Sequence, residues 1–72
     1  MTSSLKSTLG AQVREIRRGR GLTQEALAEQ LEVTPRYLAG VERGERNLTL
    51  DSVDALAQQL GVDAAALLLA QG

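Results

Sequence analysis

Residues 22–60 read LTQEALAEQLEVTPRYLAGVERGERNLTLDSVDALAQQL, and the turn near their centre predicts how the chain folds. Thr23 precedes a run of good helix formers, and its hydroxyl can cap the first N–H groups of that helix. The run ends before Thr34-Pro35, because a residue that precedes proline is pushed out of the α region. Thr34 is therefore suited to cap a second helix that has Pro35 at its first position and Gly44 beyond its end. Two helices of roughly eight to ten residues joined by about three residues must cross steeply.

The apolar residues of these two helices recur at helical spacing and indicate the faces that turn inward. Leu27, Ala28 and Leu31 share one face of the first helix. Leu38 and Val41 share one face of the second helix. Both stripes are typical of helices that bury one side in a common core.

This stretch resembles the helix-turn-helix of the Cro/phage-repressor type, also called the XRE family. Gln24, Ala28, Leu38 and Val41 carry the resemblance: in this family a small residue stands where the two helices touch, and two apolar residues anchor the second, recognition helix. The family usually has glycine where this chain has Glu32. Positive φ at that position costs a glutamate a fraction of a kcal/mol to about 1 kcal/mol.

Three further helices are predicted on either side of the central pair. A serine, Ser3 or Ser4, can cap a first helix that Gly19 ends. A fourth helix follows the cap residue Thr49, and a short fifth helix, AAALLLAQ, follows Asp63. We therefore expect an all-α, compact five-helix domain over residues 1–72, of the lambda-repressor-like type that the resemblance implies. Its family-like core is expected at about residues 9–68, the helix-turn-helix at about 23–43, and a flexible arm at 1–4.

The composition excludes several classes of function. The 72 residues suffice for one domain, and they include neither cysteine nor histidine. Disulfides, thiolate metal sites and the commonest general base are thereby excluded. We expect no catalytic residue, no metal and no cofactor. No apolar run approaches the roughly 18 to 20 residues that span a membrane, and the start MTSSLKSTLG lacks the apolar core of a signal peptide, so we expect a cytoplasmic protein.

Charge is unevenly distributed along the chain. The formal net charge is −1, but residues 1–20 hold five basic residues against one acidic residue. Residues 51–72 hold three aspartates and no basic residue. This asymmetry favours one face for an anionic partner and another face for a different task.

The resemblance implies that the recognition helix enters the major groove of double-stranded DNA, where its N-terminal residues meet base edges. Arg36 is the only long donor near the start of that helix. We expect it to contact either guanine, with about 1–3 kcal/mol of discrimination, or a phosphate. The residues expected to face the groove are Pro35, Arg36, Ala39, Gly40 and Arg43. The other expected DNA contacts are Gln24, Thr34, Tyr37, Arg46 and Asn47.

Two of these positions, Tyr37 and Gln24, have a second interpretation, and Gly40 carries a cost. Tyr37 can offer its hydroxyl to a phosphate or pack at the edge of the core. Gly40 costs the helix about 1 kcal/mol relative to alanine, which a close approach to DNA would offset. Gln24 bonds a phosphate in the resembling family, whereas helix propensity alone also explains a glutamine there.

The resemblance also implies one structural ion pair. In this family an arginine and a glutamate at the positions of Arg17 and Glu42 form a buried pair that links the first and third helices. Removal of one partner of such a pair costs about 3–5 kcal/mol. A substitution there would abolish DNA binding through loss of the fold.

The C-terminal leucines predict an interface with a second copy of the chain. A domain of this size cannot wrap three consecutive leucines from all sides, and exposed apolar patches usually mark interfaces. The homodimer interface is expected at Leu60, Val62, Leu67, Leu68 and Leu69.

The segment RYLAGVERGERNLTLDSV is similar to the controller proteins of restriction–modification systems, which are small, dimerise through C-terminal helices and bind operator DNA. The leading hypothesis is a dimeric, sequence-specific regulator on a palindromic operator, with no membrane or small-molecule partner. For an activator, exposed Glu25, Glu29 and Glu32 are positions that can touch RNA polymerase. The alternative is an antitoxin-like protein-interaction module that uses the C-terminal apolar helix.

Overall fold

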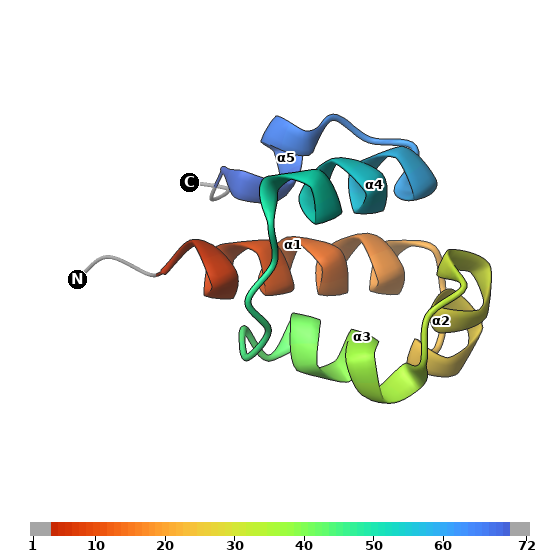
Figure 1. Ribbon diagram of the computed structural model, residues 1–72. Helices are drawn as coiled ribbons and strands as arrows, with labels where there is room; N and C mark the ends of the chain where they lie inside the picture. Colours follow the sequence, from red (N-terminus) through yellow and green to blue (C-terminus); the bar gives the residue numbers. More distant parts are fainter. Residues whose placement is uncertain (1–3, 70–72) are drawn as a thin grey trace.

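Five α-helices joined by short turns make up residues 4–69, the part of the chain that the computed structural model describes (Figure 1). The helices are α1 (Leu5–Gly19), α2 (Gln24–Leu31), α3 (Pro35–Glu42), α4 (Leu50–Leu60) and α5 (Ala64–Leu68). No strand occurs in these residues, and the predicted all-α, five-helix class is confirmed. Residues 1–3 of the expected arm lie outside the described part, whereas its last residue, Ser4, is the N-cap of α1.

Hydroxyl side chains begin the first four helices. Each accepts a hydrogen bond from the backbone N–H three residues further on, which satisfies one of the donors that a helix start leaves free. The four pairs are Ser4 with Ser7, Thr23 with Ala26, Thr34 with Tyr37 and Thr49 with Ser52.

Left-handed backbone ends two of the helices and follows the ends of two others. Gly61 ends α4 with φ 73°, and Gly21 and Gly44 follow the ends of α1 and α3 with φ 68° and 74°. Glu32 ends α2 with φ 59°, and it is the one non-glycine residue with positive φ in residues 4–69. The position where the resembling family has glycine therefore requires the conformation that glycine favours.

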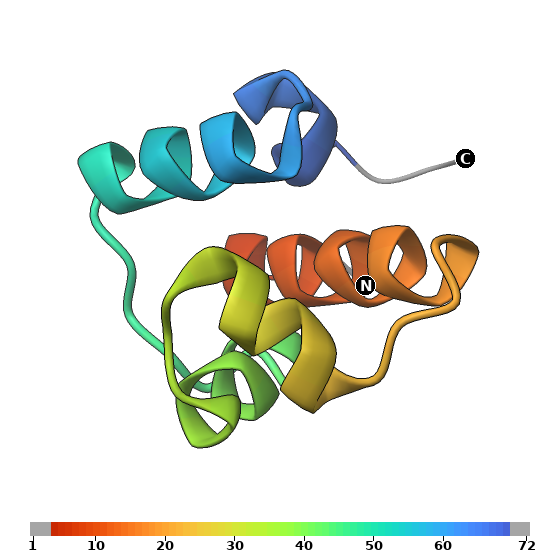
Figure 2. The same ribbon diagram turned by 90° about the vertical axis from the view of Figure 1, so that its right-hand side faces the viewer.

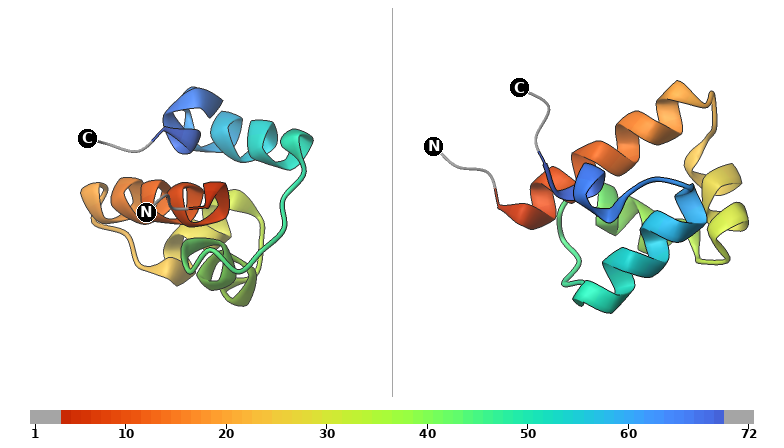
Figure 3. Two further views of the ribbon diagram at one scale, coloured as in Figure 1. Left: turned by 90° about the vertical axis from the view of Figure 1, so that its left-hand side faces the viewer. Right: turned by 90° about the horizontal axis from the view of Figure 1, so that it is seen from above.

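Helix α1 lies between α5 on one side and α3 on the other, and α2 contacts both α3 and α4 (Figure 2). Residues 43–49 lead along one edge of the molecule from α3 to α4 (Figure 3). All five helices contribute to one core: Leu9, Val13, Leu27, Ala28, Leu31, Leu38, Val41, Val53, Ala57, Leu60 and Leu67. No helix in residues 4–69 has the length and apolar composition needed to cross a membrane.

The expected exposure of the C-terminal leucines is wrong at two positions. Leu60 is 2% exposed and Leu67 is 0% exposed, because α5 packs on both α1 and α4 and closes the core there. Helix α5 ends at Leu68 and is shorter than expected; Ala70 and Gln71 of the predicted helix lie outside the described residues. Leu69 follows the helix and is 63% exposed, and Leu5, the first residue of α1, is 65% exposed.

Gly10 marks the place where α1 crosses α3. A Cβ atom at this position would lie 2.6 Å from the carbonyl oxygen of Glu42 and closer still to that of Val41. Because both neighbours are backbone atoms, a side chain at position 10 is incompatible with this crossing distance. The sequence alone does not indicate this crossing, because a glycine inside a helix otherwise only weakens it.

Candidate nucleic-acid interface

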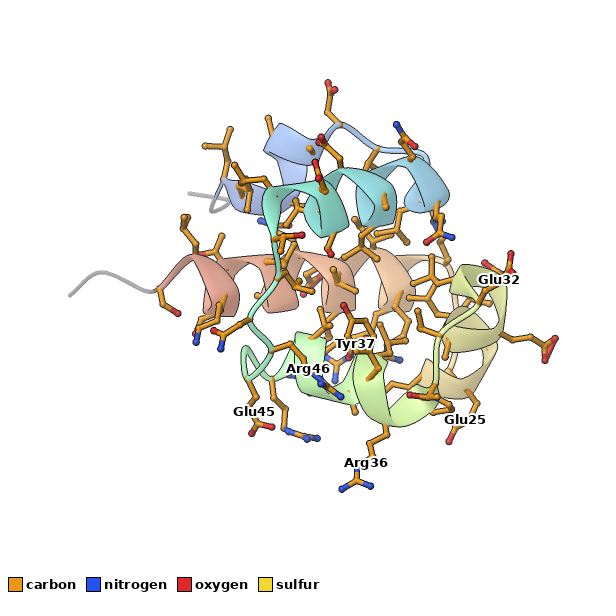
Figure 4. The ribbon with its side chains drawn as sticks, viewed as in Figure 1. Glu25, Glu32, Arg36, Tyr37, Glu45 and Arg46 are labelled. Carbon is orange, nitrogen blue, oxygen red and sulfur yellow. The ribbon has the colours of Figure 1, made fainter. Side chains whose placement is uncertain are left out.

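The first turn of α3 projects from the molecule and carries Arg36 at its outer side. Thr34, Pro35 and Arg36 are all exposed. Arg36 points away from the rest of the protein (Figure 4). The Thr34 hydroxyl oxygen accepts a 3.0 Å hydrogen bond from the Tyr37 N–H, so the start of the helix is held by its own cap. This turn can present the guanidinium of Arg36 to an anion, or insert it into the groove of a partner, without rearrangement of the backbone.

Tyr37 and Arg46 form one stacked unit beside that turn (Figure 4). The guanidinium carbon of Arg46 lies 4.9 Å from the centre of the tyrosine ring, within the range of a cation–π contact. Tyr37 is half-buried and packs against the core. The tyrosine therefore holds the arginine of the loop against the recognition helix.

Gly40 lies beneath this arginine and does not face outward as expected. It is buried, and a Cβ at this position would lie 3.3 Å from both Cγ and Nε of Arg46. The glycine makes room for a side chain of the same protein, which is a reason for it that requires no DNA. Ala39, its neighbour, is half-buried.

The far end of α3 and its loop carry paired polar residues. Arg43 forms an ion pair with Glu45 at 3.1 Å, and both side chains are 60% exposed. Such an exposed pair contributes little stability, so Arg43 remains available to another anion. Asn47 accepts a 3.0 Å hydrogen bond from Nζ of Lys6. Lys6 thus joins this edge, which sequence reasoning missed because 41 positions separate the two residues.

A buried network ties α3 to α1 and α2. Arg17 donates to both carboxylate oxygens of Glu42, with Nε 2.7 Å from Oε2 and Nη2 3.0 Å from Oε1. Its Nη1 donates to the carbonyl of Leu22 at 2.9 Å. The two charged side chains are only 13% and 4% exposed, as the resemblance implies for this pair. In residues 4–69 no buried side-chain polar atom lacks a hydrogen-bond partner.

The electrostatics of this network keep Glu42 ionised. Burial by itself raises the pKa of Glu42, but hydrogen bonds from Arg17 and Gln24 and the positive charges of Arg17 and Arg14 outweigh it, so the pKa lies below its ordinary value. The hydrogen bond to Glu42 raises the pKa of Arg17 in turn, against the opposing effect of burial. The pair is therefore a fixed, doubly charged link between helices.

Gln24 belongs to the same network. Its Nε2 lies 3.1 Å from Oε1 of Glu42, and the residue is half-buried at the first position of α2. Gln24, which was expected to be a free phosphate ligand, is thus already hydrogen-bonded to Glu42 within the protein. This contact joins two residues that were predicted separately, one for DNA and one for structure.

A groove of about 390 Å³ separates the start of α3 from α4. It adjoins the exposed turn through Thr34 and Tyr37, and Ser52 and Gln59 of α4 form its opposite polar edge.

Arg20, a basic residue beyond the end of α1, donates to the carbonyl of Leu60 at 2.6 Å, so it caps α4 and does not face the α3 side. The described residues contain no group of three or more acidic side chains placed to hold a metal ion.

Comparisons with known proteins match this geometry. A family model described as helix-turn-helix covers residues 13–67. The control protein C.SmaI of Serratia marcescens is 40% identical over 68 residues, which cover 94% of this chain and 81% of C.SmaI. Two longer HTH-type transcriptional regulators are 41% identical over 59 residues, but this chain spans only 12% of their length.

Solved structures show the same arrangement of helices. The hypothetical transcription factor NHTF from Neisseria superposes with a TM-score of 0.83 at 36% identity, over 93% of this chain and 77% of that one. The restriction–modification controller protein C.Esp1396I, solved as a tetramer in complex with its natural 35 base-pair operator, superposes with a TM-score of 0.75 at 33% identity, over 92% and 87% of the two chains. The predicted resemblance to the Cro/phage-repressor (XRE) type and to controller proteins is confirmed, and the chain belongs to the helix-turn-helix family of transcriptional regulators.

Proposed function

We propose that this protein is a sequence-specific, double-stranded DNA-binding regulator that acts as a homodimer on a palindromic operator. The observation that carries the proposal is the exposed Arg36 on the first turn of α3, a turn that Thr34 caps. Pro35, Tyr37 and Ala39 complete the surface that α3 brings to the groove. An arginine at this place can bond guanine O6 and N7 in the major groove.

The remaining contacts are to the DNA backbone in this proposal. Arg43, Arg46 and Asn47 lie at the far end of α3, and Gln24 lies at the start of α2. Two of these residues, Arg43 and Arg46, are exposed arginines, which make about four charged phosphate contacts in a dimer. Each neutralised phosphate contributes about −0.9 to the slope of log K against log salt concentration, so the expected slope is about −4.

The dimer forms through the C-terminal surface in this proposal, with fewer leucines than the sequence predicted. Leu60 and Leu67 belong to the core, which leaves half-buried Val62 and Leu68 and exposed Leu69. Leu5 on α1 is also exposed, and we include it in the proposed surface because α1 packs on α5. Two subunits related by a dyad would place their recognition helices in half-sites about one helical turn apart.

Two finer proposals follow from the same family. A controller role would place the operator beside the protein's own gene and a nuclease–methylase pair. An activator role would use Glu25, Glu29 and Glu32 to touch RNA polymerase, and all three are exposed on α2 and at its end. C.SmaI and C.Esp1396I are controllers by name, which supports the first of these.

The test is selection of bound fragments from the source genome by the purified protein at two salt concentrations. Arg36→Ala is run beside it, and Arg18→Ala serves as a matched control because Arg18 is an exposed arginine on α1. We expect the wild type and Arg18→Ala to enrich one palindromic site that Arg36→Ala loses. A folded wild-type protein that enriches no sequence would overturn the proposal and favour the antitoxin-like module.

The dimer is tested by sedimentation equilibrium. Leu69→Glu places a charge in the proposed interface, whereas Leu50→Glu places the same charge on the first residue of α4, which is 79% exposed. We expect Leu69→Glu to sediment as a monomer and Leu50→Glu to sediment like the wild type. Equal masses for both variants would place the dimer surface elsewhere.

A further inference from the structure

The Glu42 carboxylate receives hydrogen bonds from two different helices. Arg17 reaches it from α1 through two nitrogens, and Gln24 reaches it from α2 through Nε2. Oε1 is shared: Nη2 of Arg17 lies 3.0 Å from it and Nε2 of Gln24 lies 3.1 Å from it. The residue that closes the ion pair therefore also holds the first side chain of α2.

Only one orientation of the Gln24 amide satisfies this contact. An ionised carboxylate has acceptors but no donor, so the amide must turn its nitrogen toward Glu42. The amide nitrogen has two hydrogens, and the contact uses one of them. The second N–H is thereby directed away from the carboxylate, on a side chain that is half-buried and leads to the surface.

The backbone of the first turn of α2 also favours an anion beside Gln24. Thr23 caps the N–H of Ala26, and the Thr23 carbonyl accepts from the N–H of Leu27. The N–H groups of Gln24 and Glu25 belong to the first turn and have no carbonyl partner within the helix. Helix starts of this kind favour an anion such as a DNA phosphate.

We propose that Glu42 is a positioning residue for DNA: it fixes the amide of Gln24 so that the second N–H meets one phosphate in each half-site of the operator. This inference rests on the proposed function. It assigns to a buried carboxylate a role in binding beyond its structural pairing with Arg17. It also predicts that the contribution of Glu42 to affinity is confined to a single phosphate in each half-site.

The experiment uses a series of operator duplexes, each with a methylphosphonate at a single position. The substitution removes the charge and one acceptor oxygen of one phosphate. Affinity is compared for the wild type, Gln24→Met and the double variant Arg17→Met/Glu42→Met. The double variant is chosen because replacing both partners of a buried pair by apolar residues is often neutral or stabilising, whereas removing one partner is not.

We expect one position in each half-site at which the methylphosphonate weakens wild-type binding about tenfold, as for a lost hydrogen bond to a charged group. The affinities of Gln24→Met and of the double variant should change less than about twofold at these positions. They should keep wild-type sensitivity at every other position. A purely structural Glu42 would weaken binding uniformly and leave the tenfold effect in place in the double variant, which would overturn the proposal.

A second measurement uses the wild type alone and does not depend on how the variants fold. The two Nε2 protons of Gln24 are followed by NMR in the labelled protein. We expect one proton to be protected from exchange in free protein and the other to become protected only on addition of operator. Two equally exposed protons in free protein would refute the positioning role. Failure of the selection to yield any operator would instead refute the proposed function.

Discussion

Gly10→Ala should destabilise the protein although alanine is the better helix former. The position lies inside α1, where the exchange by itself favours the helix by about 1 kcal/mol. The new Cβ would nevertheless lie 2.6 Å from the Glu42 carbonyl oxygen, against an ordinary contact of 3.4 Å or more. Helices α1 and α3 would have to separate by at least about 0.8 Å to relieve this contact alone.

The cost of that separation exceeds the gain in helix propensity. Overpacking in a core costs about 1–3 kcal/mol, and here the obstruction is backbone that cannot rotate away. The same movement stretches the ion pair between Arg17 and Glu42, whose shortest distance is 2.7 Å. With the gain of about 1 kcal/mol in helix propensity subtracted, we expect a net loss of about 1–2 kcal/mol. In a domain of this size that loss lowers the melting temperature by about 10 °C.

Thermal and urea unfolding followed by far-UV circular dichroism measure the effect. Gly19→Ala is the matched control, since it changes the same residue type in the same helix where nothing lies within 4 Å of the new Cβ. The control should be unchanged or more stable by a few tenths of a kcal/mol. A Gly10→Ala protein as stable as the control would refute the reasoning that this glycine sets the distance between α1 and α3.

Three further outcomes follow from the geometry. Glu32→Gly should stabilise the protein by a fraction of a kcal/mol to about 1 kcal/mol in urea unfolding, because φ is 59° there, whereas Glu29→Gly inside α2 should destabilise it by about 1 kcal/mol. The folded state lowers the pKa of Glu42, so the stability that this group contributes is complete above its usual pKa of 4.5 and is lost as the pH falls through the lowered pKa. In urea unfolding across this pH range, Arg17→Met/Glu42→Met should therefore lose less stability than the wild type. Gly40→Ala should displace the arginine side chain that packs on it, weakening operator binding in a titration several-fold while the melting temperature holds or rises.

Much of the fold was predictable because its signals are local. Thr23, Thr34 and Thr49 cap helices as expected, since a cap depends only on the three residues that follow it. Gly44 and Gly61 adopt the left-handed conformation for equally local reasons. Periodicity likewise identified the inner faces of the two central helices.

The errors arose where one helix meets another. Periodicity predicts which face of a helix is apolar, but not which neighbour covers it or how closely. Leu67 looked exposed because the chain alone does not show that α5 packs on both α1 and α4. Gly40 looked like a weak point of its helix because the atoms that require it belong to Arg46. The need for Gly10 was not visible because the atoms that require it are backbone atoms of residues 41–42.

The same limit applies to the proposed interface. Resemblance indicated Gln24 as a phosphate ligand and Glu42 as a structural residue, but it did not indicate their mutual hydrogen bond. Lys6 was missed entirely, since its contact with Asn47 joins opposite ends of the first two-thirds of the chain. Residue types suggest what a side chain can bind, and only the packing shows what it already binds.

The contacts around α3 determine which part of it is free to read DNA. Gly10 allows α1 to approach its last turn, and Glu42 fixes that turn to α1 and α2. Arg46 lies across its middle, against Tyr37 and over Gly40. Only the first turn remains uncovered, so base discrimination should depend on Arg36 and on DNA shape, with little contribution from the middle of the helix. Because α3 is held by contacts within the protein, it would lose little conformational freedom on binding. The proposed operator binding would therefore require few charged contacts, although the net charge of the protein is −1.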